Sequence, residues 1–121
     1  MKPKYLFLVL MLAAFAAVPA PAKDRVMPPL KVTPGVDTPA SRGYMTAMEK
    51  MHKGMAITYT GDADVDFVRG MIPHHQGAVD MCKVELHYGK DAEIRKLCDN
   101  IISSQQAQIS EMKNWLRAHG K

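Results

Sequence analysis

The chain has 121 residues and a formal net charge of +4, from 16 Lys and Arg against 12 Asp and Glu. This length allows one domain with one modest core. The positive and negative charges are nearly balanced, which does not indicate nucleic-acid binding. The sequence has no Cys-x-x-Cys-His haem motif, and no arrangement typical of nucleophilic catalysis stands out. Methionine is the unusual residue, with ten copies. Methionine often does no more than fill gaps in cores, so its abundance alone predicts no site.

Residues 1–22 are predicted to be a signal peptide. Two lysines precede an apolar run from Tyr5 to Val18, and Ala20-Pro-Ala22 has the small-x-small form of a signal-peptidase site. The apolar run is too short to span a bilayer comfortably. We therefore expect a periplasmic or secreted protein that begins near Lys23 and has no membrane contact after cleavage. The alternative is an uncleaved N-terminal anchor.

Residues 23–38 are rich in proline and show no helical or strand period, which predicts an extended arm. Thr38 suits an N-cap and Pro39 the first position of a helix. This first helix is predicted to run to about Tyr59. Its methionines recur in steps of three and four, so they lie along one side of it: Met45, Met48, Met51 and Met55.

A second helix is predicted from the acidic turn at Asp62 to about Tyr88, with Gly89 as its C′ residue. Pro73 lies inside this helix and removes one backbone hydrogen bond. We expect a kink in a continuous helix there; the alternative is a break, with a new helix beginning at Pro73. His75 falls on the inner stripe of the helix, and His74 is rotated from it by about 100°.

A third helix is predicted from the N-cap Asp91 to about Ala118. The turn before it is centred near Lys90, so residues whose numbers add to about 180 should face each other. This rule pairs Cys82 with Cys98 and predicts a disulfide between them in an oxidising compartment. The same rule places His75 opposite Gln105, and Gln108 lies at the edge of the apolar stripe that contains Gln105. Gln105 is therefore the predicted amide that orients the imidazole.

Applied to the first turn, near Gly61, the same rule gives a sum of about 122. Met51 would then face Met71, and Met48 would face His74. The two turns together predict one cluster of thioethers and imidazoles: Met48, Met51, Met71, His74, His75 and Met112. Such a ligand set suits copper, and its sulfur favours Cu(I) or Ag(I) in particular.

Several residues of the second and third helices recur in a known signature: Asp66-Phe67, Met71-Ile-Pro-His-His-Gln-Gly-Ala78, Met81, Ile101-Ile102, Gln105-Gln106, Ile109, Met112, Trp115 and Leu116. Over roughly residues 64–118 the chain resembles the domain-of-unknown-function 305 family. The resemblance implies a ferritin-like bundle and bacterial export. Because the family includes a periplasmic copper-binding protein, it also implies metal contacts at four residues: His74, His75, Met71 and Met112. The two cysteines do not belong to the signature.

The sequence thus predicts an all-α, antiparallel three- to four-helix bundle over residues 39–119 that is ferritin-like in arrangement. We expect a binding protein rather than an enzyme, with Cu(I) preferred over Ag(I) or Cu(II), serving copper buffering, resistance or delivery. Its affinity should fall in acidic solution, because histidine must be neutral to bind a metal. A homodimer would cover the sides of the two long helices that the shorter first helix leaves open. The sequence names no copper-trafficking partner.

Three other interpretations remain open at this stage. The histidines and glutamines would form a hydrogen-bonded core network in a metal-free bundle. A di-iron oxidase would use Glu-x-x-His motifs, for which Glu49-Lys-Met-His52 has the only matching spacing. A haem held non-covalently by methionine and histidine is the third.

Overall fold

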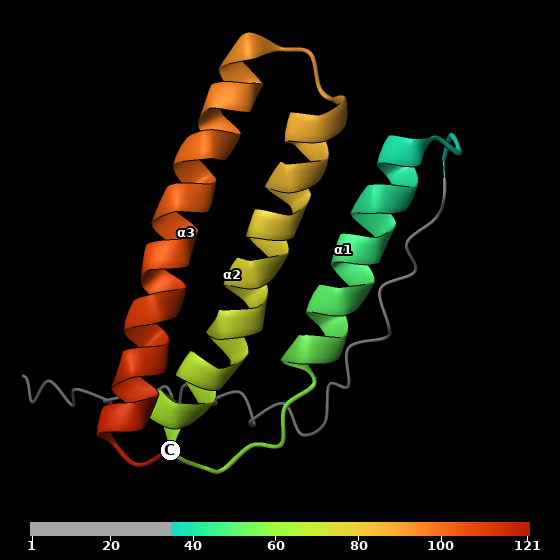
Figure 1. Cartoon of the computed structure of the whole chain (residues 1–121). Helices are drawn as coiled ribbons and strands as arrows, with labels where there is room; N and C mark the ends of the chain where they lie inside the picture. Colours follow the sequence, from blue (N-terminus) through green and yellow to red (C-terminus); the bar gives the residue numbers. More distant parts are fainter. Residues whose placement is uncertain (1–34) are drawn as a thin grey trace, which may run out of the picture. The chain divides into compact units, whose positions relative to one another are not determined.

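The computed structural model describes residues 35–121, which form three α-helices and no strand (Figure 1). The helices are α1 (Pro39–Met55), α2 (Ala63–Tyr88) and α3 (Ala92–Ala118). The prediction of an all-α bundle is therefore confirmed. The predicted signal peptide, and the predicted arm up to residue 34, lie outside the described residues. Within residues 35–121 no helix is long and apolar enough to cross a membrane.

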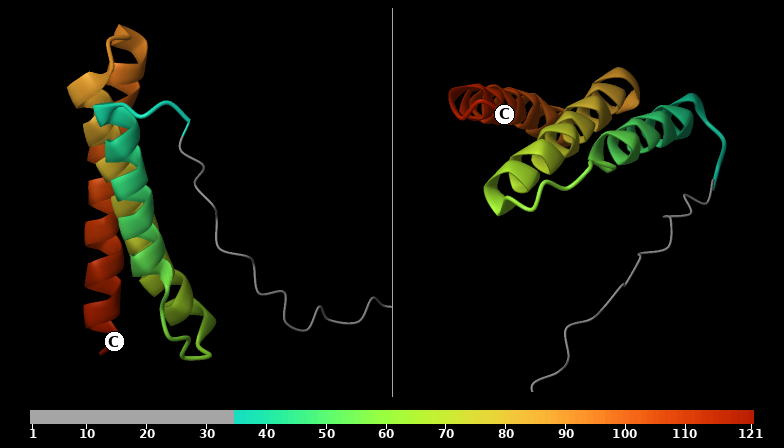
Figure 2. Two further views of the ribbon diagram at one scale, coloured as in Figure 1. Left: turned by 90° about the vertical axis from the view of Figure 1, so that its right-hand side faces the viewer. Right: turned by 90° about the horizontal axis from the view of Figure 1, so that it is seen from below.

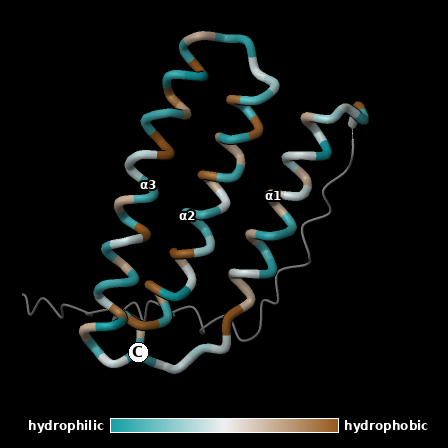
Figure 3. The backbone as a smooth tube through the Cα atoms, viewed as in Figure 1, coloured by the Kyte–Doolittle hydropathy of each residue, from teal (hydrophilic) through white to brown (hydrophobic). Residues whose placement is uncertain are grey.

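Helix α2 lies in the middle of a row of three helices, and neighbouring helices run antiparallel (Figures 1 and 2). Among the described residues, α1 and α3 each pack against α2 but not against each other. Hydrophobic and hydrophilic positions alternate along each helix, as expected where part of the helix surface is exposed (Figure 3). The core is correspondingly small: Ala47, Val65, Val68, Val79, Cys82, Cys98 and Ile109. Each outer helix is thus held by a narrow strip of contacts with α2.

All three helices begin at the caps that the sequence predicts. At Thr38 a capping box forms, in which the Ser41 N–H donates to the Thr38 hydroxyl at 3.1 Å and the Thr38 N–H donates to the Ser41 hydroxyl at 2.7 Å. Pro39 follows at the first helical position. The carboxylates of Asp62 and Asp91 each accept two backbone N–H groups of the next turn. Because these contacts are local, the sequence was sufficient to locate them.

The ends of the helices differ more from the prediction. Helix α1 ends at Met55 rather than Tyr59. Helix α2 runs without a break through Pro73, as predicted. Gly89 ends α2, but with φ −71° and ψ 150° it is extended and not the left-handed C′ glycine that we expected. Arg95 supplies the cap instead, donating to the Leu86 carbonyl at 2.6 Å and to the Gly89 carbonyl at 3.0 Å.

The connection between α1 and α2 is anchored by one carboxylate, that of Asp66. It accepts the Thr60 N–H and hydroxyl, both at 2.8 Å, and the Gly61 N–H at 3.0 Å. The Thr60 N–H does most to lower the pKa of this carboxyl. Gly61 turns the chain with φ 87°, which glycine adopts without strain. The loop is thereby tied to the first turn of α2.

This connection also sets how α1 lies along α2. Residues 56–62 are not helical, and extended chain advances about 3.3 Å per residue against about 1.5 Å in a helix. The end of α1 therefore lies beside the middle of α2: a methyl group built at Gly54 would be 2.6 Å from the Cβ atom of Pro73. Likewise, Met51 packs on Gly77. The expected pairings of Met51 with Met71 and of Met48 with His74 are therefore wrong, because we assumed a tight turn.

The close approach of α1 and α2 at Gly77 gives a first prediction. A methyl group at Gly77 would lie 2.5 Å from the Sδ atom and 2.9 Å from the Cβ atom of Met51, so α1 would have to move. We expect Gly77→Ala to lower the free energy of unfolding by about 1–2 kcal/mol, because overpacking outweighs the gain in helix propensity. Urea denaturation followed by circular dichroism measures this change.

Gly70 in the same helix is the matched control. A methyl group there meets only the Cδ1 atom of Ile57, at an ordinary 3.9 Å. Gly70→Ala should therefore stabilise the protein by up to about 1 kcal/mol. Equal stabilisation by both substitutions would show that Met51 does not fix the spacing of the two helices.

Candidate metal site

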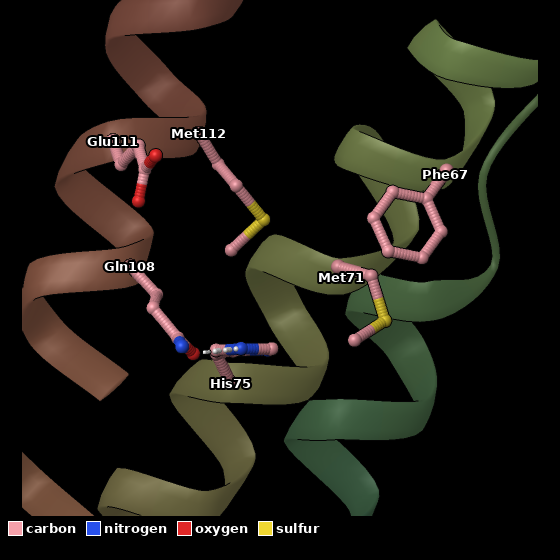
Figure 4. A pocket seen from close by; sticks show the side chains of 6 residues that line it. All are labelled: Phe67, Met71, His75, Gln108, Glu111 and Met112. Atoms are coloured by element: carbon pink, nitrogen blue, oxygen red, sulfur yellow. Dashed lines mark hydrogen bonds between the residues drawn. The ribbon is translucent and has the colours of Figure 1, made fainter. Parts of the chain in front are cut away.

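A cavity of about 280 Å³ lies between α2 and α3. Three of its lining residues come from α2 and three from α3 (Figure 4): Phe67, Met71, His75, Gln108, Glu111 and Met112. On α2 they recur every four residues, and on α3 at steps of three and one, so each set lies on one side of its helix. The cavity thus depends on the packing of these two helices alone.

His75 is the polar centre of this cavity. Its Nε2 atom lies 2.7 Å from the Oε1 atom of Gln108, so the Nε2–H donates to the amide oxygen. In a neutral imidazole the other nitrogen, Nδ1, then carries a lone pair. Nδ1 is buried and is the only buried side-chain nitrogen or oxygen in residues 35–121 that lacks a hydrogen-bond partner. Such a group costs free energy unless something binds it.

Two thioethers accompany this imidazole. The side chains of Met71 and Met112 extend from facing helices toward the level of His75 (Figure 4). Phe67 lies beside Met71 and is 63% exposed, and Glu111 is exposed on α3. The cavity therefore combines neutral sulfur and nitrogen donors with a rim at the protein surface.

The structure brings together three of the six predicted ligands: Met71, His75 and Met112. His74 is exposed and does not line the cavity, although its ring centroid is 5.9 Å from that of His75. Met51 lies in a separate cavity of about 200 Å³ between α1 and α2, and Met48 lines neither cavity. The two methionines of α1 are displaced because the register of α1 on α2 differs from the predicted one.

Gln108, not Gln105, is the partner of His75. Side chains of a helix lean toward its N-terminus, so in an antiparallel pair His75 leans away from the turn and Gln108 leans back toward it. Their numbers therefore add to more than 180. The sequence also missed Phe67 and Glu111 as lining residues. A correction for the direction of the side chains would have favoured Gln108.

The second cavity holds charged groups that already have partners. Asp80 is bound by the Lys50 ammonium at 3.1 Å and by the Gln76 amide at 2.9 Å. Burial raises the pKa of Asp80, but these two hydrogen bonds and the charges of Lys50 and Lys83 together outweigh it, so the pKa is lowered. Across residues 35–121 no group of three or more His, Cys, Asp or Glu side chains is placed to hold a metal ion. Glu49 and His52 are thus not part of such a group within one chain.

Cys82 and Cys98 face each other across α2 and α3, as predicted, and a hydrogen bond joins their side chains. Both are free thiols in this structure, and the disulfide between them stays a prediction. Burial, together with that hydrogen bond, raises the pKa of Cys82 to about 12. The pair is separate from the cavity, about two helical turns from His75 along α2.

The fold and the cavity define a small α-helical protein whose two longest helices share a thioether and imidazole site. A family model described as "Domain of unknown function (DUF305)" matches residues 16–120. The chain therefore belongs to this family, as its sequence signature suggested. It is also similar to "Uncharacterized protein L153" of Acanthamoeba polyphaga mimivirus, with 43% identity over 53 residues. That match covers 44% of this chain and 35% of the viral protein.

The contact between His75 and Gln108 gives a second prediction. In the metal-free protein the His75 ring should be mainly in the form protonated at Nε2, because Gln108 accepts that hydrogen. Nitrogen-15 NMR of the imidazole distinguishes the two neutral forms. Gln108→Ala should abolish the preference, and Gln105→Ala should preserve it. An unchanged ring spectrum in Gln108→Ala would contradict this assignment.

Proposed function

We propose that this protein binds a soft monovalent metal ion, Cu(I) in preference to Ag(I), through His75, Met71 and Met112. The observation that carries the proposal is the buried Nδ1 atom of His75, which has no partner in a cavity that also holds two thioethers. A nitrogen lone pair and two sulfur atoms together form a donor set typical of copper sites.

The charge of the donors favours Cu(I) over Cu(II). Thioethers and a neutral imidazole carry no charge, and the carboxylate among the lining residues, Glu111, is exposed. A divalent ion would remain largely uncompensated by such ligands, and Cu(II) prefers nitrogen and oxygen in tetragonal geometry. A singly charged, polarisable ion gains most from sulfur. The same donors would accept Ag(I).

Gln108 would act as a positioning residue in this site. By accepting the hydrogen of Nε2, it leaves Nδ1 as the nitrogen that can bind the ion. Histidine ligands in metalloproteins commonly have their second nitrogen held in this way, which fixes the ring. The methionine side chains are flexible enough to move as an ion reaches the buried Nδ1.

Binding of this kind needs no catalytic base, and we propose buffering, resistance or delivery of copper as the role. The predicted export signal would locate that role in the periplasm or outside the cell. A metal-free bundle is the competing interpretation, in which His75 and Gln108 only join two helices. The unpartnered Nδ1 counts against it, since a purely structural histidine would have both nitrogens satisfied.

A competition titration against a coloured Cu(I) chelator, without oxygen, tests the proposal. The three site substitutions are His75→Ala, Met71→Leu and Met112→Leu. Each should weaken Cu(I) binding by about tenfold or more, because each removes one donor. Leucine keeps the volume of methionine approximately, so the fold should survive. All measurements are made on a Cys82→Ala/Cys98→Ala background, since thiolates bind Cu(I) as well.

Matched controls come from predicted ligands that lie outside the cavity. His74→Ala, Met48→Leu and Met51→Leu should leave the Cu(I) affinity within about twofold. Equal affinity of His75→Ala and His74→Ala would rule out this site. No Cu(I) binding by the parent protein would favour the metal-free bundle.

A further inference from the structure

Outside the metal site, the pair Cys82 and Cys98 is the most unusual arrangement of reactive groups. The side chains are 5% and 7% exposed, lie on α2 and α3, and are joined by a hydrogen bond. Two thiols within hydrogen-bonding distance need only a small approach to form a disulfide. The residue numbering about the turn at Lys90 and the structure therefore both place these two cysteines together, although both sulfurs are free in this structure.

A bond between these sulfurs would strengthen the interface that holds α3 on α2. Among the described residues α3 packs only on α2, and Cys98 and Ile109 are its two buried residues. Other direct links include Arg95, which holds the end of α2, and Gln108, which holds His75. A covalent link at Cys98 would keep α3 in place even if these polar contacts opened.

The chemistry of the folded pair determines when such a bond can form. The thiolate is the reactive species in disulfide exchange, and the pKa of Cys82 is raised to about 12. Both sulfurs are also covered by the protein. In the folded protein at neutral pH the pair is therefore nearly inert. Exchange is rapid only when α3 is away from α2, as in a chain that has not yet folded.

We propose that Cys82 and Cys98 are the site of a structural disulfide, formed by exchange with a disulfide reagent before α3 docks on α2. One cysteine thiolate attacks the reagent RSSR, which gives a mixed disulfide and releases RS⁻. The second thiolate attacks the mixed disulfide at the protein sulfur and releases another RS⁻. In total two protein thiols lose two electrons and two protons, and RSSR becomes two RSH. The bond stabilises the packing of α3 on α2 and does not act as a redox switch.

Refolding the denatured, reduced protein in a glutathione redox buffer that contains a metal chelator tests this proposal. After oxidative refolding, mass spectrometry should show the loss of two hydrogen atoms, and thiol titration in denaturant should find no free thiol. The oxidised protein should melt on the order of 10 °C above the dithiol form, as expected for a loop of about 15 residues in a small domain. The dithiol protein, folded first, should oxidise far more slowly, and moderate urea should accelerate it.

The double variant Cys82→Ala/Cys98→Ala is the control, and it should melt at one temperature in both buffers. Two free thiols after oxidative refolding, or glutathione adducts in place of the bond, would overturn the proposal. Equal melting temperatures of the oxidised and dithiol forms would show that the disulfide does not stabilise the fold. Oxidation of the folded protein as fast as the unfolded one would contradict the order of events. None of these measurements requires copper, so their outcome is independent of the proposed function.

Discussion

The packing of α3 on α2 is the contact on which the candidate site depends. Helix α1 reaches neither α3 nor the cavity, so all six lining residues belong to the two helices of one hairpin. A short hairpin turn holds their register at one end, where Arg95 binds the last carbonyls of α2. At the other end the buried contact is largely Ile109. Small rotations of α3 would therefore change the distance between Met112 and His75 directly, and the same interface contains both cysteines.

The imidazole of His75 is half-buried, and its buried Nδ1 atom is costly for stability, which makes its presence informative. An aliphatic side chain would pack between α2 and α3 without any polar group to satisfy. His75 instead has one nitrogen bound by Gln108 and one without a partner. An unsatisfied buried group of this kind costs about 1–3 kcal/mol, a large share of the stability of a small domain. Under the proposed function, this cost is offset when an ion binds the free lone pair.

The sequence was sufficient to predict features that depend on neighbouring residues, but not those that depend on residues far apart in the chain. Thr38, Asp62 and Asp91 were identified correctly as caps because each acts within one turn of chain. Cys82 and Cys98 are neighbours across α2 and α3, as expected, because a short turn fixes the register of the two helices nearby. The predicted register of α1 on α2 was wrong because residues 56–62 are not helical, and no period in the sequence reveals the path of such a segment. Gln105 was preferred over Gln108 because counting residues ignores the lean of side chains.

The methionines show why the sequence predicted more ligands than the cavity contains. Met51 fills the space above Gly77, where α2 has no side chain, so it serves the packing of α1. Met71 and Met112 instead share a cavity with an unpartnered nitrogen. These methionines therefore have two different surroundings: Met51 packs between α1 and α2, and Met71 and Met112 line the cavity that we propose as the metal site. The two faces of α2 keep them apart: residues that contact α1 cannot also face α3. The donor set that we propose, two sulfurs and one nitrogen, is neutral, so it is better matched to a singly charged ion than to a divalent one.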